Sequence, residues 1–78
     1  MATLNITYNG LSADYPMELD VQVSDADIRR IAVELVRSGS VPGLNLPHLP
    51  DNAFDGFVVD RLQHGQRIYL RPKVPFGA

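Results

Sequence analysis

The chain has 78 residues, which suffices for one small domain with a thin core and excludes a second domain. Its composition, 45% hydrophobic and 21% charged, excludes a disordered tail, and its net charge of −2 argues against a nucleic-acid or anionic-membrane surface. It has no cysteine, which excludes disulfides and thiolate zinc sites.

Two strands are predicted before the helix. Residues 2–8 alternate between apolar and polar side chains, so we expect a strand with one buried face. Asn9-Gly10 follows as a turn signal, for a loop of two residues or one that extends through Ser12 to Asp14. A longer alternation over residues 15–23 predicts a second, antiparallel strand. Pro16 lacks the N–H that a ladder needs, which predicts that this second strand lies at the edge of the sheet.

Residues 24–38 are predicted to form an amphipathic helix. Ser24 stands at the N-cap position, and Gly39 follows as the left-handed residue that commonly ends a helix. Five apolar residues share one stripe: Ile28, Ile31, Ala32, Leu35 and Val36. Two pairs of opposite charge lie at helical-neighbour spacing outside the stripe: Asp25 with Arg29, and Glu34 with Arg30. The stripe must lie on an apolar surface, because an isolated helix this short is marginal in water.

The second half of the chain begins with a long irregular segment, residues 39–56, in which prolines and glycines prevent regular structure. Such a length implies a packed loop or a mobile functional one, and we favour a packed loop pinned by Leu44, Leu46, Leu49 and Phe54. Residues 57–62 and 67–71 are predicted strands around a turn at 63–66, and an extended segment, 72–78, ends the sequence.

The predicted element order is strand, strand, helix, strand, strand. A right-handed crossover through the helix lets the last strand pair in parallel with the first. The expected fold is therefore α+β, ββαββ, with a four-stranded mixed sheet of order 2-1-4-3 and the helix packed on one face.

This arrangement is the β-grasp, and two stretches resemble ubiquitin-like proteins. Residues 17–35, MELDVQVSDADIRRIAVEL, resemble the edge strand and capped helix of ubiquitin, and residues 67–77, RIYLRPKVPFG, resemble its last strand and glycine-ended tail. The pattern looks closer to the small bacterial ubiquitin-like proteins found with activating-enzyme and deubiquitinase homologues than to ubiquitin itself. The resemblance implies one ubiquitin-like domain over residues 1–78, with a C-terminal tail at 72–78, that acts as a protein modifier or a protein-interaction module.

The tail departs from the family pattern, which usually ends in paired glycines. Here Ala78 would have to be removed before the Gly77 carboxylate could be adenylated. In a second reading, Phe76 fills an apolar groove on the body and Gly77-Ala78 is a frayed end. The resemblance also leaves open a sulfur carrier for cofactor biosynthesis, or a scaffolding module in a larger assembly.

Basic and aromatic residues of the last two strands form a candidate partner surface. We expect Arg61, Arg67, Arg71 and Lys73 to gather near Val58 and Tyr69 on the exposed sheet face. The predicted partner-binding residues are Val58, Tyr69, Arg71, Lys73 and Phe76, because Tyr and Arg are enriched where partners bind. The alternative is a solvated face on which Asp60 pairs with Arg67 or Arg71. The expected partners are proteins, and an activating or conjugating enzyme or a processing peptidase if the chain is a modifier.

The sequence offers no catalytic constellation. His48 and His64 lack ligand-spaced partners, so we expect both to be exposed and expect no metal site, no cofactor and no enzymatic activity. The first residues lack the basic start and apolar run of a signal peptide, and no apolar stretch is long enough to span a membrane. We therefore expect a cytoplasmic location.

Overall fold

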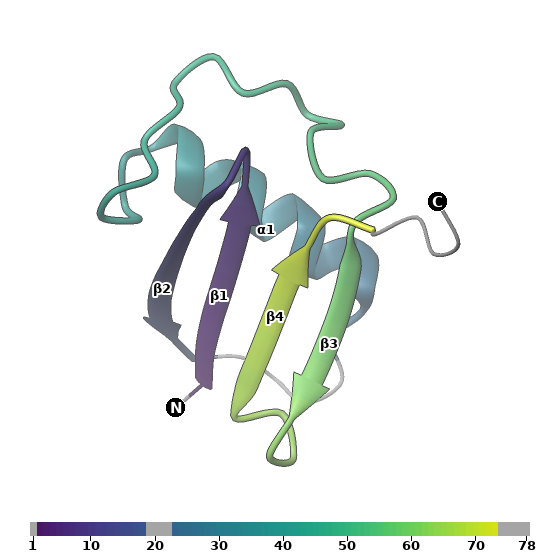
Figure 1. Ribbon diagram of the computed structural model, residues 1–78. Coiled ribbons are helices and arrows are strands. Elements are labelled where there is room, and N and C mark those ends of the chain that lie inside the picture. Colours follow the sequence, from purple (N-terminus) through teal and green to yellow (C-terminus); the bar gives the residue numbers. More distant parts are fainter. Residues whose placement is uncertain (1, 19–22, 74–78) are drawn as a thin grey trace.

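The computed structural model describes residues 2–18 and 23–73. The elements along the chain are β1 (Ala2–Tyr8), β2 (Leu11–Met17), α1 (Asp25–Arg37), β3 (Val58–Leu62) and β4 (Arg67–Arg71). The strands form one sheet of order β2-β1-β4-β3, in which β1 and β4 are parallel and the two hairpins are antiparallel. The helix covers one face of this sheet, and the segment between α1 and β3 arches over one end (Figure 1). The predicted α+β layout and strand order are confirmed.

The first hairpin turns within two residues. Asn9 and Gly10 both have positive φ, 51° and 80°, as the tight turn that matches strand twist requires. This turn places Leu11 directly opposite Tyr8, so β2 begins at Leu11. Of the two loop lengths left open, the two-residue one is present; the longer loop, with the strand starting at residue 15, was suggested by polar residues that occupy the solvent side of the strand. The prediction for residues 19–22 lies outside the described residues.

The edge position predicted from Pro16 is confirmed, and the ladder explains why proline fits there. The backbone N–H of Thr3, which lies opposite Pro16, donates to the Gln66 carbonyl at 2.9 Å, so the backbone of Thr3 points toward β4. Backbone directions alternate along a strand, so Pro16 would direct its N–H away from β1 if it had one. Its missing donor therefore removes no bond from the sheet.

The helix begins and ends as the sequence predicts. The Ser24 hydroxyl accepts a hydrogen bond from the Asp27 amide at 3.1 Å, which caps the first turn. At the other end, Gly39 adopts φ of 76° and the Ser40 amide donates to the Leu35 carbonyl at 3.1 Å. This closing bond defines a Schellman motif, which turns the chain away from the helix axis.

Both predicted ion pairs on the helix were wrong, because the two arginines bind other partners. Arg29 donates from two nitrogens to the Phe57 carbonyl at 2.9 and 3.1 Å instead of pairing with Asp25. Arg30 pairs with Asp27 at 2.8 Å instead of Glu34. An exposed helical pair contributes only about 0.2 to 0.5 kcal/mol, so a fixed carbonyl at the start of β3 competes well for Arg29.

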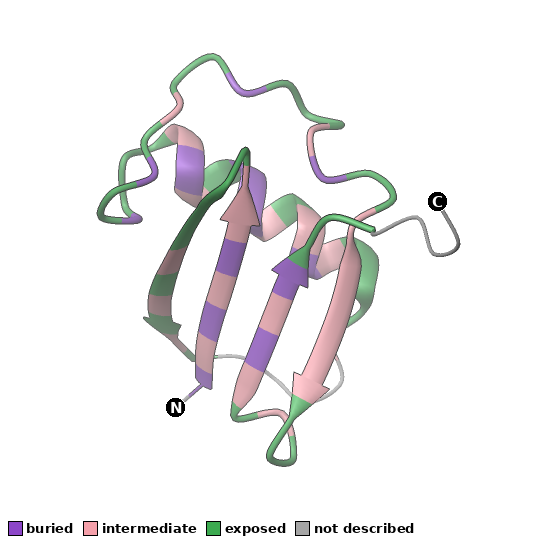
Figure 2. Ribbon diagram, viewed as in Figure 1, coloured by how far each residue is buried: buried purple, intermediate pink, exposed green. Residues whose placement is uncertain are grey.

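The core lies between α1, the sheet and the arching loop (Figure 2). Four helix residues are buried: Ile28, Ala32, Val33 and Val36. The predicted stripe was therefore wrong in part, because Ile31 and Leu35 are only partly buried and Val33 is 3% exposed. Val33 lies one turn before Arg37, which binds the loop, so a second side of the helix is covered.

The loop of residues 39–56 is packed, as predicted. Leu44, Leu49 and Phe54 are buried and Leu46 is partly buried against the core. Arg37 ties this loop to the helix: its guanidinium donates to the Leu49 carbonyl and to the Asp51 carboxylate, each at 2.6 Å.

No helix within residues 2–18 and 23–73 has the length and apolar character needed to cross a membrane.

Candidate protein-binding surface

The sheet face that points away from α1, here called the outer face, is covered by no other element of the described chain (Figure 1). Side chains alternate along each strand, so every second residue lies on this face. They are Thr3, Asn5 and Thr7 of β1, Ser12, Asp14 and Pro16 of β2, Val58, Asp60 and Leu62 of β3, and Arg67, Tyr69 and Arg71 of β4.

The β1–β2 half of the outer face satisfies its own polar groups. The Asn5 amide donates to the Ser12 hydroxyl at 3.0 Å and to the Asp14 carboxylate at 2.8 Å. The Asn5 carbonyl oxygen accepts from the Thr7 hydroxyl at 3.3 Å. The donors and acceptors of this half are therefore largely used within it.

The β3–β4 half is charged and aromatic. Arg67 donates from Nε to the Tyr69 hydroxyl at 3.0 Å, and its guanidinium lies 5.6 Å from the centre of the Tyr69 ring. The hydrogen bond to Tyr69 raises the pKa of the Arg67 guanidinium, which keeps its charge. Beside it, Arg71 pairs with Asp60 across the hairpin. The alternative predicted for Asp60, a cross-strand pair with Arg71, is thus present.

A shallow depression of about 340 Å³ lies on this half and is lined by Asp60, Arg61, Leu62, Tyr69 and Arg71. Leu62 is 51% exposed, as Leu11 is at 52% in the other hairpin, so its side chain is accessible to a partner. The depression therefore combines an apolar wall with one carboxylate and one guanidinium, a mixture that suits a side chain of another polypeptide.

The predicted partner-binding residues are only partly brought together. Val58 lies opposite Arg71 and one position from Tyr69 on the outer face, and Lys73 is exposed just beyond the end of β4. Phe76, like the processing residues Gly77 and Ala78, lies outside the described residues.

Arg61 was wrongly expected on the outer face. Its guanidinium lies on the helix side and donates to the Val23 carbonyl and the Asp25 carboxylate, each at 2.7 Å. The alternation of β3 predicts this position, because Arg61 falls between Asp60 and Leu62, which both lie on the outer face. The same alternation could have identified Leu62, which the sequence analysis did not single out.

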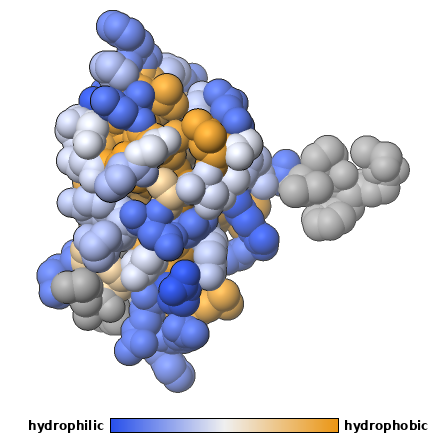
Figure 3. All heavy atoms as spheres, turned by 60° about the vertical axis from the view of Figure 1, so that its left-hand side comes forward, coloured by the Kyte–Doolittle hydropathy of each residue, from blue (hydrophilic) through white to orange (hydrophobic). Residues whose placement is uncertain are grey.

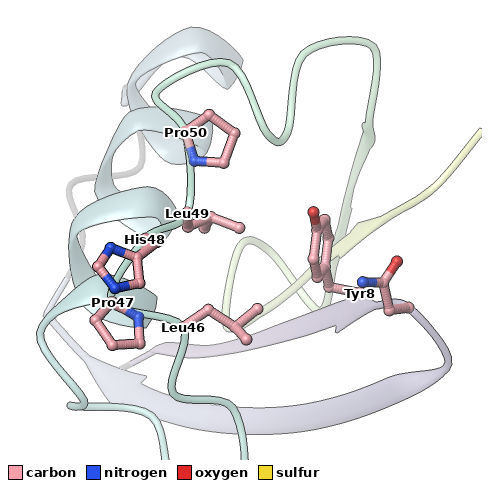
Figure 4. Close-up of a pocket in the computed structure, with 7 residues that line it drawn as sticks. Tyr8, Leu46, Pro47, His48, Leu49 and Pro50 are labelled. Atoms are coloured by element: carbon pink, nitrogen blue, oxygen red, sulfur yellow. The ribbon is translucent and has the colours of Figure 1, made fainter.

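A second hollow, of about 300 Å³, opens between the end of β1 and the loop. Leu46 and Leu49 face Tyr8 across it (Figure 4). Tyr8 also packs edge-on against Phe54, with ring centres 5.5 Å apart. Apolar atoms gather on the upper part of this side of the molecule, where the loop lies (Figure 3).

Both histidines are exposed, as predicted. Among the residues that the structure describes, no group of three or more His, Cys, Asp or Glu side chains could hold a metal ion. No buried polar or charged residue occurs in the same part of the chain.

Comparisons with known proteins found no matching family model, no matching curated protein and no matching solved structure.

Proposed function

We propose that this chain is a small ubiquitin-like protein-interaction module that binds other proteins through the β3–β4 half of its outer face and acts further through its C-terminal residues. It is a non-enzymatic protein of the cytoplasm. The observation that carries the proposal is the half-face on which Asp60, Tyr69, Arg71 and the exposed Leu62 line one depression.

The chemistry of this half-face supports a protein partner. Tyr and Arg provide large contact area and several donors, and both residue types are enriched at binding hot spots. Arg67, Arg71 and Lys73 stand against a single carboxylate, Asp60, so the region is locally positive on a chain whose net charge is −2. A partner with acidic side chains around an apolar one would complement it.

Affinity enrichment with quantitative mass spectrometry tests the half-face. The full chain, its Tyr69→Ala variant and its Ser12→Ala variant serve as baits, since Ser12 lies on the same outer face but in the β1–β2 half. We expect specific partners to be retained by the wild type and by Ser12→Ala, and depleted at least tenfold by Tyr69→Ala. If no protein distinguishes the two variants, the half-face is not the binding surface.

The C-terminal residues define the kind of module. We propose that the chain is conjugated through Gly77 after removal of Ala78. Mass spectrometry of the protein from cells should then reveal chains that end at Gly77 and isopeptide adducts of that residue. A thiocarboxylate at Gly77 would instead identify a sulfur carrier, and an Ala78 that is always retained would leave a non-covalent interaction or scaffolding module.

A further inference from the structure

β3 forms one edge of the sheet, and its unpaired backbone groups can be assigned. The Thr3 amide donates to the carbonyl of Gln66, just before β4. The backbone N–H and C=O groups of every second residue from there, Ile68 and Leu70, therefore point toward β1. The residues between them, including Tyr69, direct theirs toward β3. Because Asp60 lies opposite Tyr69, the backbone N–H and C=O groups of its neighbours Val59 and Arg61 must point away from the sheet.

The two edges of the sheet differ in what they offer. At the β2 edge, Pro16 occupies an outward-pointing position and removes one donor, which leaves the outward amides of Ser12 and Asp14 but interrupts the row that an added strand would pair with. At the β3 edge, Val59 and Arg61 keep both donors and both acceptors, and no described element lies beside them (Figure 1). Among the described strands, β3 is therefore the edge whose outward donors are uninterrupted.

The inner side of β3 is fixed in place. Arg29 holds the Phe57 carbonyl just before the strand, and Arg61 is bound to the Val23 carbonyl and the Asp25 carboxylate. An inward-pointing charge often protects a strand edge, but the charge of Arg61 already has its partners. An added strand would thus meet an ordered backbone and leave no unpaired charge on the helix side.

A second copy of this chain fits the edge poorly. A two-fold axis at Asp60 would face two carboxylates across the new ladder, and one at Arg61 would face two guanidinium groups. An axis at Val59 would require the backbone of Phe57, whose amide donates to Phe54 and whose carbonyl is held by Arg29. Each of these three symmetric registers therefore either opposes like charges or lacks backbone partners.

We propose that an extended segment of a different protein adds to the sheet as a fifth strand at β3, with an apolar side chain opposite Leu62. The backbone of Val59 and Arg61 supplies the hydrogen bonds. Side chains of an added strand alternate between faces, so its outer-face side chain reaches the depression beside Leu62 and Tyr69. This inference rests on the proposed function, since it names how the partner meets the β3–β4 half-face.

Amide hydrogen exchange of the free full chain gives the first test. The amides of Val59 and Arg61 should exchange at least tenfold faster than those of Asp60 and Tyr69, which lie in the ladder. Protection of Val59 and Arg61 in the free protein would overturn the inference, because the edge would already be covered. Protection that rises with protein concentration would also overturn it, because the occupant would be a second copy.

Ten-residue peptides selected from a random phage-displayed library against the immobilised full chain give the second test. Bound peptide should slow exchange at Val59 and Arg61 at least tenfold and leave the outward amides of Ser12 and Asp14 unchanged. Val59→Pro, which removes one outward donor, should weaken binding at least tenfold. Ser12→Pro, the matched change at the β2 edge, should weaken it less than twofold. If Val59→Pro fails to fold, the exchange pattern of the wild-type complex decides.

The outcomes separate this inference from the proposed function. Peptides that shift the resonances of Tyr69 and Arg71 without slowing exchange at Val59 and Arg61 would overturn strand addition and leave the half-face as a binding surface. Peptides that bind away from both, or a selection that yields none, would overturn both proposals.

Discussion

The β1–β2 and β3–β4 hairpins are two halves of one sheet that use their outward polar groups differently. In β1–β2, Asn5 binds Ser12 and Asp14, and Pro16 removes one outward donor from the edge. In β3–β4, the outer face carries an exposed ion pair and Leu62, and the edge keeps its backbone donors. The same supersecondary unit thus pairs most of its outward polar side chains on one side of the sheet and leaves charges and an apolar side chain exposed on the other.

This contrast separates stabilising contacts from contacts left for a partner. Polar groups that bind one another within a half have little to gain from a partner, whereas exposed charges and an open edge gain when a partner removes water. The two halves should therefore contribute equally to stability but differ in what they offer a partner.

The largest loss of stability is expected for Phe54, whose ring contacts residues of both halves. Phe54 is 1% exposed and its ring packs against Tyr8, at the end of β1, and Phe57, just before β3. Phe54→Ala should lower the free energy of unfolding by about 3 to 5 kcal/mol, a large share of the about 4 to 12 kcal/mol expected for a chain this size. Urea denaturation measures the loss, with the exposed Leu62→Ala as control at about 0.5 kcal/mol or less. Amide exchange that accelerates in only one hairpin would show that the halves unfold separately.

A proline placed at neighbouring positions of β3 separates the edge from the ladder. Asp60→Pro removes an N–H that bonds to β4, so it should lower the free energy of unfolding by about 3 kcal/mol. Val59→Pro removes only an outward N–H, so it should cost markedly less, about 1 kcal/mol, mainly through the lost packing of a partly buried side chain. Thermal and urea unfolding of the two variants give the comparison. Equal losses would mean that the assigned backbone directions are reversed.

The turns of the two hairpins should respond alike. Gly10 and Gly65 have φ of 80° and 84°, and a Cβ added to either would meet no atom within 4 Å. The loss from Gly→Ala is therefore conformational, about 1 to 2 kcal/mol at each site. Asn tolerates positive φ better than Ala does, so Gly10→Asn and Gly65→Asn should lose less stability than the alanine variants. Denaturation midpoints measure the difference. A much larger loss at Gly10 than at Gly65 would show that the two-residue turn alone fixes its register.

Most of the fold could be predicted because its signals are local. The alternation of residues 2–8, the capped helix at 24–38 and the spacing of the later strands each lie within one segment. The start of β2 could not be read this way, because Ser12 and Asp14 resemble a loop until the turn sets the pairing. The burial of Val33 is equally non-local, since it depends on a loop that follows the helix.

The candidate surface was less predictable for the same reason. Val58, Tyr69 and Arg71 follow from strand alternation, and the structure places them on one face. Arg61 was assigned by its charge rather than by its position in the alternation, which puts it on the helix side. The backbone directions of Val59 and Arg61 depend on the pairing of β1 with β4, which no single segment encodes.

The smallest expected effect comes from the ion pair of the β3–β4 half. The side chains of Arg71 and Asp60 are 59% and 36% exposed, so water already solvates both charges. A double-mutant cycle with Arg71→Ala and Asp60→Ala should give a coupling below about 1 kcal/mol, which 1 M salt should largely remove by shortening the screening length to about 3 Å. A coupling above about 2 kcal/mol, or one insensitive to salt, would contradict this. A weak pair can be broken by a partner at little cost, so its weakness is what leaves Arg71 free to bind an acidic side chain.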